Sequence, residues 1–396
     1  MYALSLDIAY AQKLFPAFLH STNRRGHSVT NIPHEATVSL RLARRFIDGL
    51  QEAAFPFESL LQDILRYQGK HNPPLSAYWK SKGFDSGEVR DFDEVPAVPT
   101  DVFRYVELCS NEAPPQGVFR TSGTTSGARG QHFHLSTLAY DAGAIRHFQN
   151  VVLGQDQKTH FVHVAFPPRT HPDSSLSHML RVFGEALGRD ARSLDFYFEE
   201  EGLRVDALKK RLNDAVAEGE PITLFGTAFG LADTLDHLPA MQLPKGSRII
   251  QTGGFKGRRE ALEPSEFYLA LAQHYGLPVG AVLAEYGMTE LSSQLYSNLQ
   301  QPAETPEASA SRRLLPPPWC RVDACDPETL RVLPQGERGL LRFSDCANID
   351  SAAIIQSSDL GIVHPDGIEL IGRMPGATPR GCSLAIEELR SHAPRR

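Results

Sequence analysis

The sequence has few cysteines, no long apolar run and no basic leader. Its five cysteines are an odd number without C-x-x-C spacing, which indicates neither a disulfide framework nor a zinc ribbon. The apolar runs are far shorter than the ~20 residues that a membrane-spanning helix needs. Residues 1–20 include Asp7 and lack the basic start of a secretory signal peptide. These absences predict a cytoplasmic protein without a membrane span.

Basic residues are not concentrated in any part of the chain. The 396 residues include 40 Lys and Arg against 47 Asp and Glu, which gives a formal net charge of −7. Proteins that bind nucleic acid usually present a concentrated basic face, so nucleic acid is not an expected partner. A content of 41% apolar residues allows a large core, and the length favours two lobes or one large domain with a small appendage.

The spacing of apolar residues predicts helices first and an α/β pattern afterwards. The N-terminal third has the periodicity of buried helix faces. From about Pro96, short β-type runs alternate with helical segments, the runs at 160–166, 222–225, 248–252 and 279–283 and the segments at 136–150, 174–187, 205–217 and 264–275. This alternation predicts an α/β fold with mainly parallel sheets flanked by helices. Ligands of such sheets bind at the carboxyl ends of the strands.

Capping and turn residues refine this pattern. In the helix at 264–275, Ser265 can serve as the N-cap and Gly276 can end the helix. Residues 300–318 show no periodicity and are predicted to form a loop or linker. After this segment, a β-hairpin is expected around a turn at 365–367.

The segment 121–127 contains only threonine, serine and glycine. Glycines let the backbone approach a ligand closely, and hydroxyls and amides supply hydrogen-bond donors, so the segment is suited to bind an oligophosphate such as that of ATP. It is not the common P-loop, because Gly127 is followed by Ala128 and Arg129 where that motif has a lysine and a hydroxyl residue. Taken alone, such a run is more often a mobile surface loop.

Three further motifs follow this loop in a particular order. They are Thr252-Gly253-Gly254, then Glu285-Tyr286-Gly287-Met288-Thr289-Glu290, then Asp359-Leu360-Gly361 with Gly372-Arg373. This order resembles the adenylate-forming superfamily of acyl-CoA synthetases, luciferases and peptide-synthetase adenylation domains. Within it, the chain is most similar to the acyl-protein synthetase branch, the LuxE-type fatty-acid ligases of bacterial luminescence operons. That similarity rests on residues 95–103, 286–294 and 380–384, and it extends over roughly 91–390.

The resemblance implies that the enzyme activates a carboxylic acid with ATP, forming an acyl adenylate and releasing pyrophosphate. By family default the acid is a long-chain fatty acid. The loop would hold the β- and γ-phosphates, and its residues are Thr121, Ser122, Gly123, Thr124, Thr125, Ser126 and Gly127. Arg129 would add a cation where relatives commonly have lysine, with the charge kept and the geometry changed to a fork.

The same resemblance assigns roles to the later motifs. Gly253, Gly254, Tyr286, Gly287 and Met288 would surround the nucleotide, with Tyr286 stacked on the adenine. Thr289 would bind the α-phosphate, Glu290 would bind Mg²⁺ and Asp359 would bind the ribose hydroxyls. Arg373, at the Gly-Arg hinge, would have a catalytic role. The alternative for Glu290 and Asp359 is an ordinary solvated loop carboxylate, and for Tyr286 an ordinary aromatic residue at a strand end.

Histidines are frequent between residues 160 and 178, but their spacing does not match a metal site. Zinc-type pairs on a helix fall at i and i+4, and these histidines do not. In relatives, an aromatic or histidine residue at this place closes the carboxylate pocket. The resemblance therefore makes His163, Phe166 and His178 candidates for the substrate pocket, with purely structural roles as the alternative.

Only 23 residues follow Arg373, whereas typical superfamily members continue into a mobile lid domain that brings a catalytic lysine. We therefore expect this lid domain and its lysine to be absent. The last lysine of the chain, Lys256, is a possible compensating cation, and the alternative is an exposed loop lysine.

Cys382 in the C-terminal tail matches the cysteine to which the acyl-protein synthetase branch transfers its acyl group. A thioester keeps the acyl group activated, and a thiol on a flexible tail can visit two active sites in turn. The neighbouring Arg380 could lower the pKa of the thiol. The implied partner is an acyl reductase or another acyl-accepting protein. The other four cysteines are expected to be buried core residues.

These inferences divide the chain into four predicted parts. They are a helical N-terminal segment packed on the main domain at 1–90, an α/β ATP-binding core at 91–300, a β-rich subdomain at 301–372 and the short tail at 373–396. Two other functions stay open. One is a ligase that passes its acyl group to CoA, a carrier-protein thiol or an amine, and the other is a non-catalytic nucleotide-binding subunit.

Overall fold

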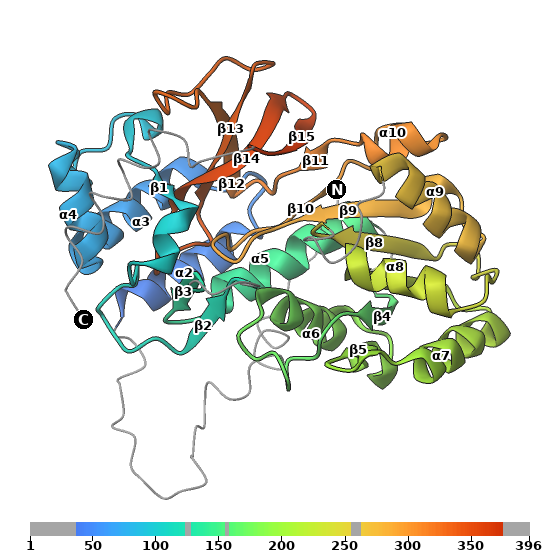
Figure 1. Cartoon of the computed structure of the whole chain (residues 1–396). Coiled ribbons are helices and arrows are strands. Elements are labelled where there is room, and N and C mark those ends of the chain that lie inside the picture. Colours follow the sequence, from blue (N-terminus) through green and yellow to red (C-terminus); the bar gives the residue numbers. More distant parts are fainter. Residues whose placement is uncertain (1–36, 123–127, 155–157, 255–262, 375–396) are drawn as a thin grey trace, which may run out of the picture.

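The computed structural model describes residues 37–122, 128–154, 158–254 and 263–374. Within these residues, one eleven-stranded sheet has the order β12-β13-β14-β15-β11-β10-β9-β8-β7-β4, with β1 paired to β14. Helices lie on both sides of this sheet (Figure 1). The α/β class predicted from the sequence is therefore confirmed.

One half of the sheet is parallel and lies between two layers of helices. Its strands are β4 (His160–Val164), β7 (Ile222–Thr227), β8 (Arg248–Thr252) and β9 (Val282–Tyr286). One core joins one face of these strands to α7 (Val205–Glu218), α8 (Ala228–His237) and α9 (Pro264–Tyr275). Another core joins the opposite face to α5 (Leu138–Phe148) and α6 (Ser175–Leu187). Both faces are apolar because successive side chains of a strand point to opposite sides.

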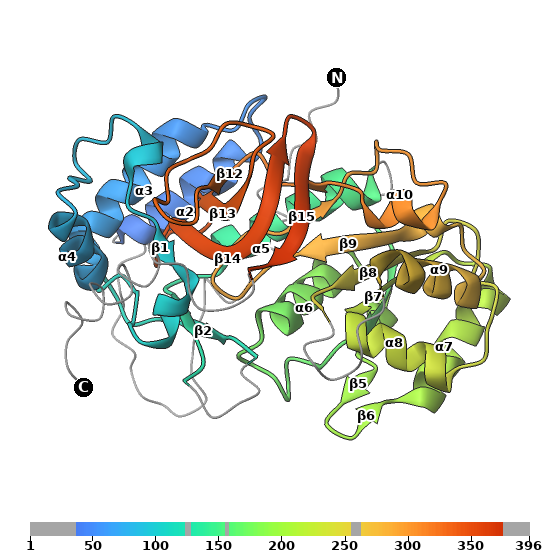
Figure 2. The ribbon, with the colours of Figure 1, turned by 45° about the horizontal axis from the view of Figure 1, so that its top comes forward.

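The other half of the sheet is antiparallel and packs on the N-terminal helices. Its strands are β10 (Leu295–Ser297), β11 (Leu314–Leu315), β12 (Cys320–Cys325), β13 (Arg338–Asp345), β14 (Ile354–His364) and β15 (Gly367–Arg373). The helices are α2 (Val38–Gly49), α3 (Phe57–His71) and α4 (Pro73–Ser81), and they share one core with these strands (Figure 2). Phe46 of α2, for example, meets Trp319 edge to face with a centroid distance of 5.5 Å.

Short elements complete the described structure. The strands are β1 (Val98–Pro99), β2 (Gly117–Arg120) paired with β3 (Gln131–His134), and β5 (Phe198–Glu199) paired with β6 (Gly202–Leu203). A 3₁₀ helix, η3 (Thr100–Arg104), follows β1. In the part of the chain that the structure describes, no helix is long and apolar enough to cross a membrane. The domain boundaries at 90, 300 and 372 stay predictions.

Several local predictions are confirmed, and one capping residue is wrong. Helix α9 has the predicted bounds, and Gly276 ends it with a φ of 61°. The helix begins after Glu263 with Pro264 in its first turn, so Ser265 lies inside the helix and is not its cap. The β14–β15 hairpin also forms as expected, with His364 opposite Gly367.

Two stretches differ from the sequence prediction. The expected strand at 279–283 is a 3₁₀ turn over Val279–Ala281 followed by β9, which continues to Tyr286 because it pairs with β8 and β10. The expected loop at 300–318 contains α10 (Pro306–Ala310), capped by the Thr305 hydroxyl, and strand β11. Helix α10 and strand β11 are each too short to show a periodic pattern of apolar residues in the sequence.

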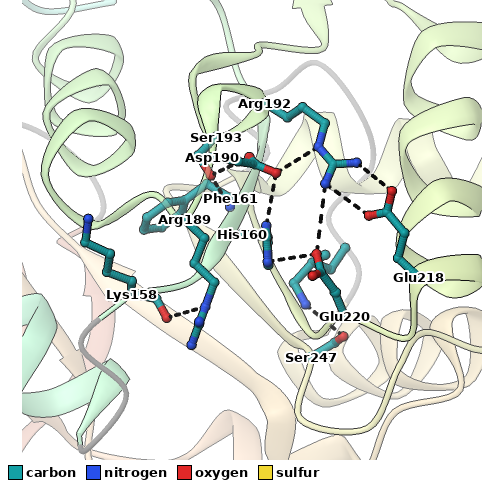
Figure 3. Close-up of polar contacts among 11 residues, drawn as sticks. Lys158, His160, Phe161, Arg189, Asp190, Arg192, Ser193, Glu218, Glu220 and Ser247 are labelled. Carbon is teal, nitrogen blue, oxygen red and sulfur yellow. Dashed lines mark hydrogen bonds and ion pairs between the residues drawn. The ribbon is translucent and has the colours of Figure 1, made fainter.

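At the amino end of β4, a cluster of charged side chains surrounds His160 (Figure 3). Nδ1 of His160 lies 3.3 Å from Oδ2 of Asp190, and Nε2 lies 2.9 Å from Oε2 of Glu220. Arg192 contacts both of these acids and a third, with Nε 2.8 Å from Asp190 and with Nη2 3.9 Å from Glu220 and 3.0 Å from Glu218. The cluster ties the loops that precede β4 and β7 to the segment after α6.

We expect His160→Phe to lower the free energy of unfolding by about 1–2 kcal/mol, because Asp190 and Glu220 lose the polar imidazole that lies between them. Urea unfolding monitored by circular dichroism measures this change. His237→Phe is the control, since His237 is exposed and its Nδ1 lies 2.8 Å from Asp233 O of its own helix, and we expect a change within about 0.5 kcal/mol. Equal losses in the two variants would contradict the role of the cluster.

Candidate functional site

The described ends of the hydroxyl and glycine loop are joined by hydrogen bonds. Strands β2 and β3 pair up to Arg120 and Gln131. Beyond this pair, Thr121 N donates to Gly130 O at 3.0 Å, and Gly130 N donates to the Thr121 hydroxyl oxygen at 2.9 Å. Of the predicted loop residues, Gly123, Thr124, Thr125, Ser126 and Gly127 lie outside the described residues. The structure thus shows a fixed base from which the loop starts and to which it returns.

Arg129 is held at this base by three contacts. Its Nε donates to Thr121 O at 2.6 Å and its Nη2 to Arg120 O at 3.2 Å, while Nη1 lies 2.9 Å from Oδ2 of Asp173. The planar fork of arginine suits this arrangement, since one guanidinium can meet several acceptors at once. The side chain stays 40% exposed, so its charge lies at the loop with one face open to solvent.

The Glu290 carboxyl lies against the base of the loop. A Cβ atom built on Gly130 would be 3.3 Å from Oε1 of Glu290 and 3.0 Å from Cγ2 of Thr121. Glu290 is only 8% exposed, and burial raises the pKa of its carboxyl to about 7, an effect partly offset by Arg104 and Arg373. A buried carboxyl beside a hydroxyl-bearing loop is a place where a cation and phosphate oxygens could meet.

Side chains from distant segments hold the turn that carries Thr289 and Glu290. Asn348 Nδ2 donates to Glu290 O at 3.1 Å, and His132 Nδ1 lies 2.8 Å from Thr289 O. Asp345 accepts from Ser292 N at 3.0 Å and from the Ser293 hydroxyl at 2.8 Å. The sequence did not point to His132, Asn348 or Asp345, because none belongs to a motif and their partners are far away in the chain.

Tyr286, Asp359 and Arg373 are brought together at the end of β9. The Tyr286 hydroxyl donates to Oδ2 of Asp359 at 2.8 Å, and Asp359 is paired with Arg373 across β14 and β15. Phe343 stacks on Tyr286 with a centroid distance of 5.9 Å and an interplanar angle of 15°. Burial raises the pKa of the Tyr286 hydroxyl well above its usual value, so it is a hydrogen-bond donor at neutral pH.

Gly253 and Gly254 follow the neighbouring strand β8. In the parallel register, Thr252 is opposite Glu285, and the Thr252 hydroxyl donates to the Glu285 carboxyl. Gly253 has a φ of 65°, a value that glycine adopts without strain, and a Cβ built on either glycine would meet no atom within 4 Å. The turn therefore leaves open space next to Tyr286.

Gly287 and Met288 connect Tyr286, at the end of β9, with the Thr289–Glu290 turn. A Cβ built on Gly287 would lie 2.7 Å from Oε1 of Glu285, so a side chain at this position would displace that buried carboxyl. Met288 is partly buried against the core that includes Leu291 and Phe343. The segment thus passes tightly from the strand end to the Thr289–Glu290 turn.

The three candidates for the substrate pocket have different neighbours. His163 is fully buried between Phe161 and Phe196, with Nε2 2.9 Å from Ser193 O. Phe166 stacks on His171 with a centroid distance of 4.1 Å. The contacts of these two residues do not join them to the groups around Glu290.

His178 has surroundings of another kind. Its Nε2 lies 2.6 Å from Oδ1 of Asp141, and its ring meets those of Phe119 and Tyr140. Asp141 also lines a cavity of about 220 Å³ between α5 and α6. His178 is therefore the candidate whose neighbours reach a cavity. Two other predicted residues, Lys256 and Cys382, lie outside the described residues.

The described fold has a counterpart among solved structures. A solved structure of 2-hydroxyisobutyryl-CoA ligase in complex with 2-HIB-AMP and CoA is similar to this chain with a TM-score of 0.56. The two are 15% identical, and the match covers 84% of this chain and 78% of the other. At this identity the likeness shows the fold, which is that of the adenylate-forming enzymes. Two other solved structures have lower TM-scores and are matched over only about half of their own length.

The family model for acyl-protein synthetase, LuxE, matches residues 50–390, and the chain belongs to this family. Two relatives bear the name long-chain-fatty-acid–luciferin-component ligase, and each is 23% identical to this chain. The protein of Aliivibrio fischeri matches 76% of this chain and 80% of its own length, and that of Vibrio harveyi 86% and 89%. The predicted acyl-protein synthetase-like ligase is thereby confirmed.

Proposed function

We propose that this enzyme activates a long-chain fatty acid with ATP and transfers the acyl group to the thiol of Cys382. The observation that carries the proposal is the placement of Glu290 against the base of the hydroxyl and glycine loop, in a chain that belongs to the acyl-protein synthetase family. The names of the two relatives support a long-chain fatty acid as the substrate.

The nucleotide would bind across the ends of β8 and β9. The open space at Gly253 and Gly254 accommodates a flat base beside Tyr286. Asp359 accepts one bond from Tyr286, and a carboxylate has about four acceptor positions, which leaves capacity for both ribose hydroxyls. The Tyr286 bond also fixes the direction of the carboxylate before a ribose arrives.

Mg²⁺ fits the donor set that these residues provide. Within the described ranges, no group of three or more His, Cys, Asp or Glu side chains could hold a metal ion. Mg²⁺ commonly binds through one or two carboxylates together with phosphate oxygens and water, so Glu290 is a sufficient protein ligand. The bound ion would neutralise phosphate charge.

The proposed reaction has two steps. A carboxylate oxygen of the acid forms a bond to the α-phosphorus of ATP while the bond to the β-phosphate oxygen breaks, and pyrophosphate leaves. Thr289 would bind the α-phosphate, and the loop with Arg129 would bind the leaving pyrophosphate. In the second step the Cys382 thiolate attacks the acyl carbonyl and AMP leaves. The thioester would then be passed to an acyl reductase or another acyl-accepting protein.

An acid panel tests this function. We expect ATP–pyrophosphate exchange only when an acid is present, with faster exchange for long-chain fatty acids than for short-chain or aromatic acids. The exchange assay follows radioactive pyrophosphate incorporated into ATP. Binding of ATP without exchange for any acid would contradict the proposal and favour a non-catalytic nucleotide-binding subunit. Acyl transfer to added CoA or an amine, without labelling of the protein, would favour the other ligase function.

A further inference from the structure

One buried imidazole joins three chain segments that carry the proposed nucleotide contacts. His132 lies in β3, two residues after Gly130, and is 1% exposed. Its Nδ1 lies 2.8 Å from Thr289 O, and its Nε2 lies 2.9 Å from Oδ1 of Asn348. The stem of the hydroxyl loop is thus tied to the turn that carries Thr289 and to the segment before β14.

Asn348 extends this connection to Glu290. Its Nδ2 donates to Glu290 O at 3.1 Å, and the side chain is also 1% exposed. Two successive carbonyl groups, those of Thr289 and Glu290, are therefore held by one pair of contacting side chains. Asn348 precedes β14, the strand that carries Asp359, so the pair also joins the part of the site that is proposed to bind ribose.

The ring of His132 has little freedom to leave this position. Phe103 of η3 meets it edge to face with a centroid distance of 5.7 Å, and the ring of His134 lies 4.1 Å away. The Thr289 carbonyl and the amide oxygen of Asn348 can only accept hydrogen bonds, so each ring nitrogen of His132 faces an acceptor. An apolar side chain of similar size would fill the space and leave the Thr289 carbonyl without this polar partner.

We propose that His132 is a positioning residue for adenylation and acts together with Asn348. The pair fixes the Thr289–Glu290 turn relative to the described base of the hydroxyl and glycine loop, Thr121 and Gly130, so that the α-phosphate and the leaving pyrophosphate are held in line. This inference rests on the proposed function, in which those two segments bind adjacent phosphates. Alignment of this kind is sensitive, since a displacement of about 1 Å can cost about 10²-fold in rate.

The variants His132→Leu and Asn348→Leu, alone and combined, test this proposal in the full chain. With the acid that gives the fastest exchange, we expect each single change to lower kcat of ATP–pyrophosphate exchange by about 10- to 100-fold. We expect KM for ATP to stay within about threefold of wild type, because neither residue contacts Tyr286 or Asp359. The double variant should be no slower than the slower single variant, since the two side chains act as one unit.

His147→Leu is the matched control. His147 in α5 is buried, with Nε2 3.0 Å from Leu315 O, so the change also removes a buried contact between a histidine and a carbonyl group. We expect a comparable fall in melting temperature but a kcat close to that of wild type. In His132→Gln, an amide donor for Thr289 O is retained, and part of the lost rate should return.

Hydrogen–deuterium exchange gives a readout that does not depend on activity. Amides of the 288–293 segment should exchange faster in His132→Leu and unchanged in His147→Leu. A folded His132→Leu protein with kcat within about threefold of wild type would overturn the proposal, as would rate losses that multiply in the double variant. Absence of pyrophosphate exchange in the wild type would contradict the proposed function instead, and unchanged deuterium uptake would still overturn the positioning role.

Discussion

Replacing Glu290 with glutamine is expected to lower kcat of ATP–pyrophosphate exchange by about 10²- to 10³-fold, the range seen when one charge-stabilising group is removed from an active site. The amide keeps the size of the side chain but removes the negative charge proposed to hold Mg²⁺ beside the 121–129 loop. Exchange measured over a range of Mg²⁺ concentrations checks this expectation, and the wild type should need less Mg²⁺ for half-maximal rate.

The pH dependence of exchange gives a second test of the same residue. Because the pKa of Glu290 is raised to about 7, the ionised form is lost as the pH falls through 7, and the wild-type rate should fall with it. Added Mg²⁺ favours the ionised carboxylate, so higher Mg²⁺ should move this limb of the profile to lower pH. In Glu290→Gln, the fall in exchange rate as the pH drops through 7 should be absent. A wild-type limb that stays in place at every Mg²⁺ concentration would contradict the assignment.

Loss of folding can be separated from loss of function in this variant. A carboxyl with a raised pKa in the folded state stabilises the protein fully below its ordinary pKa of about 4.5, and that stability is lost as the pH rises through about 7. Glutamine does not ionise, so Glu290→Gln should be at least as stable as the wild type at pH 8, by up to about 3 kcal/mol.

Asp350→Asn is the control for Glu290→Gln. Asp350 is a buried carboxyl whose pKa is raised by burial to about 6, and it binds Ser39 and the backbone of Leu135. This variant changes an equally buried carboxyl outside the proposed phosphate and metal contacts. Exchange should therefore stay within about threefold of the wild-type rate. If Asp350→Asn lost as much activity as Glu290→Gln, the assignment of Mg²⁺ to Glu290 would fail.

Replacing Cys382 with serine is expected to abolish the hydroxylamine-labile labelling of the protein by radioactive fatty acid and ATP. The other four cysteines are buried, as predicted, and burial raises the pKa of Cys109 and Cys325 to about 12 and those of Cys320 and Cys346 well above the usual value. Because only a thiolate attacks an acyl adenylate efficiently, these four thiols are poor acceptors at neutral pH. Cys382 is therefore our proposed acceptor.

The adenylation step should survive the Cys382→Ser change. We expect pyrophosphate exchange within about threefold of wild type, because the proposed nucleotide contacts come from other residues. Cys109→Ala is the control and should keep both exchange and labelling, since Cys109 is a core residue. Thiol-ester label that persists in Cys382→Ser would show that another residue accepts the acyl group.

Much of the fold is predictable from local patterns. Helix α9 shows its apolar stripe and its terminal Gly276 within a dozen residues, and the β14–β15 hairpin is indicated by its turn. Such elements depend on neighbours in the chain. The division of the sheet into a parallel and an antiparallel half depends instead on pairings such as that of β11 with β15, which two-residue strands cannot reveal in a sequence.

The candidate site also combines residues that the sequence indicates with residues that only tertiary contacts reveal. The resemblance of the ordered motifs to the adenylate-forming family was enough to nominate Thr289, Glu290 and Asp359 as candidates. The contacts of Arg129 could not be predicted, since its partner Asp173 lies 44 residues away in the chain and accepts a hydrogen bond from Nη1 of the guanidinium. His132 and Asn348 were hidden for the same reason, because their partners come from other segments.

The sequence by itself determined the chemistry that this protein can perform, namely the hydroxyl and glycine loop, the Thr-Glu pair and the acidic residue that follows them. Only the tertiary structure shows where the two neighbouring carboxyls of Glu285 and Glu290 lie. Glu285 and Glu290 are equally buried neighbours, and the pKa of each is raised to about 7, yet Glu285 turns to Thr252 while Glu290 lies beside Gly130. The physical reason is that parallel strands bring distant chain ends together, and buried carbonyl groups are then satisfied by whichever donors the fold supplies.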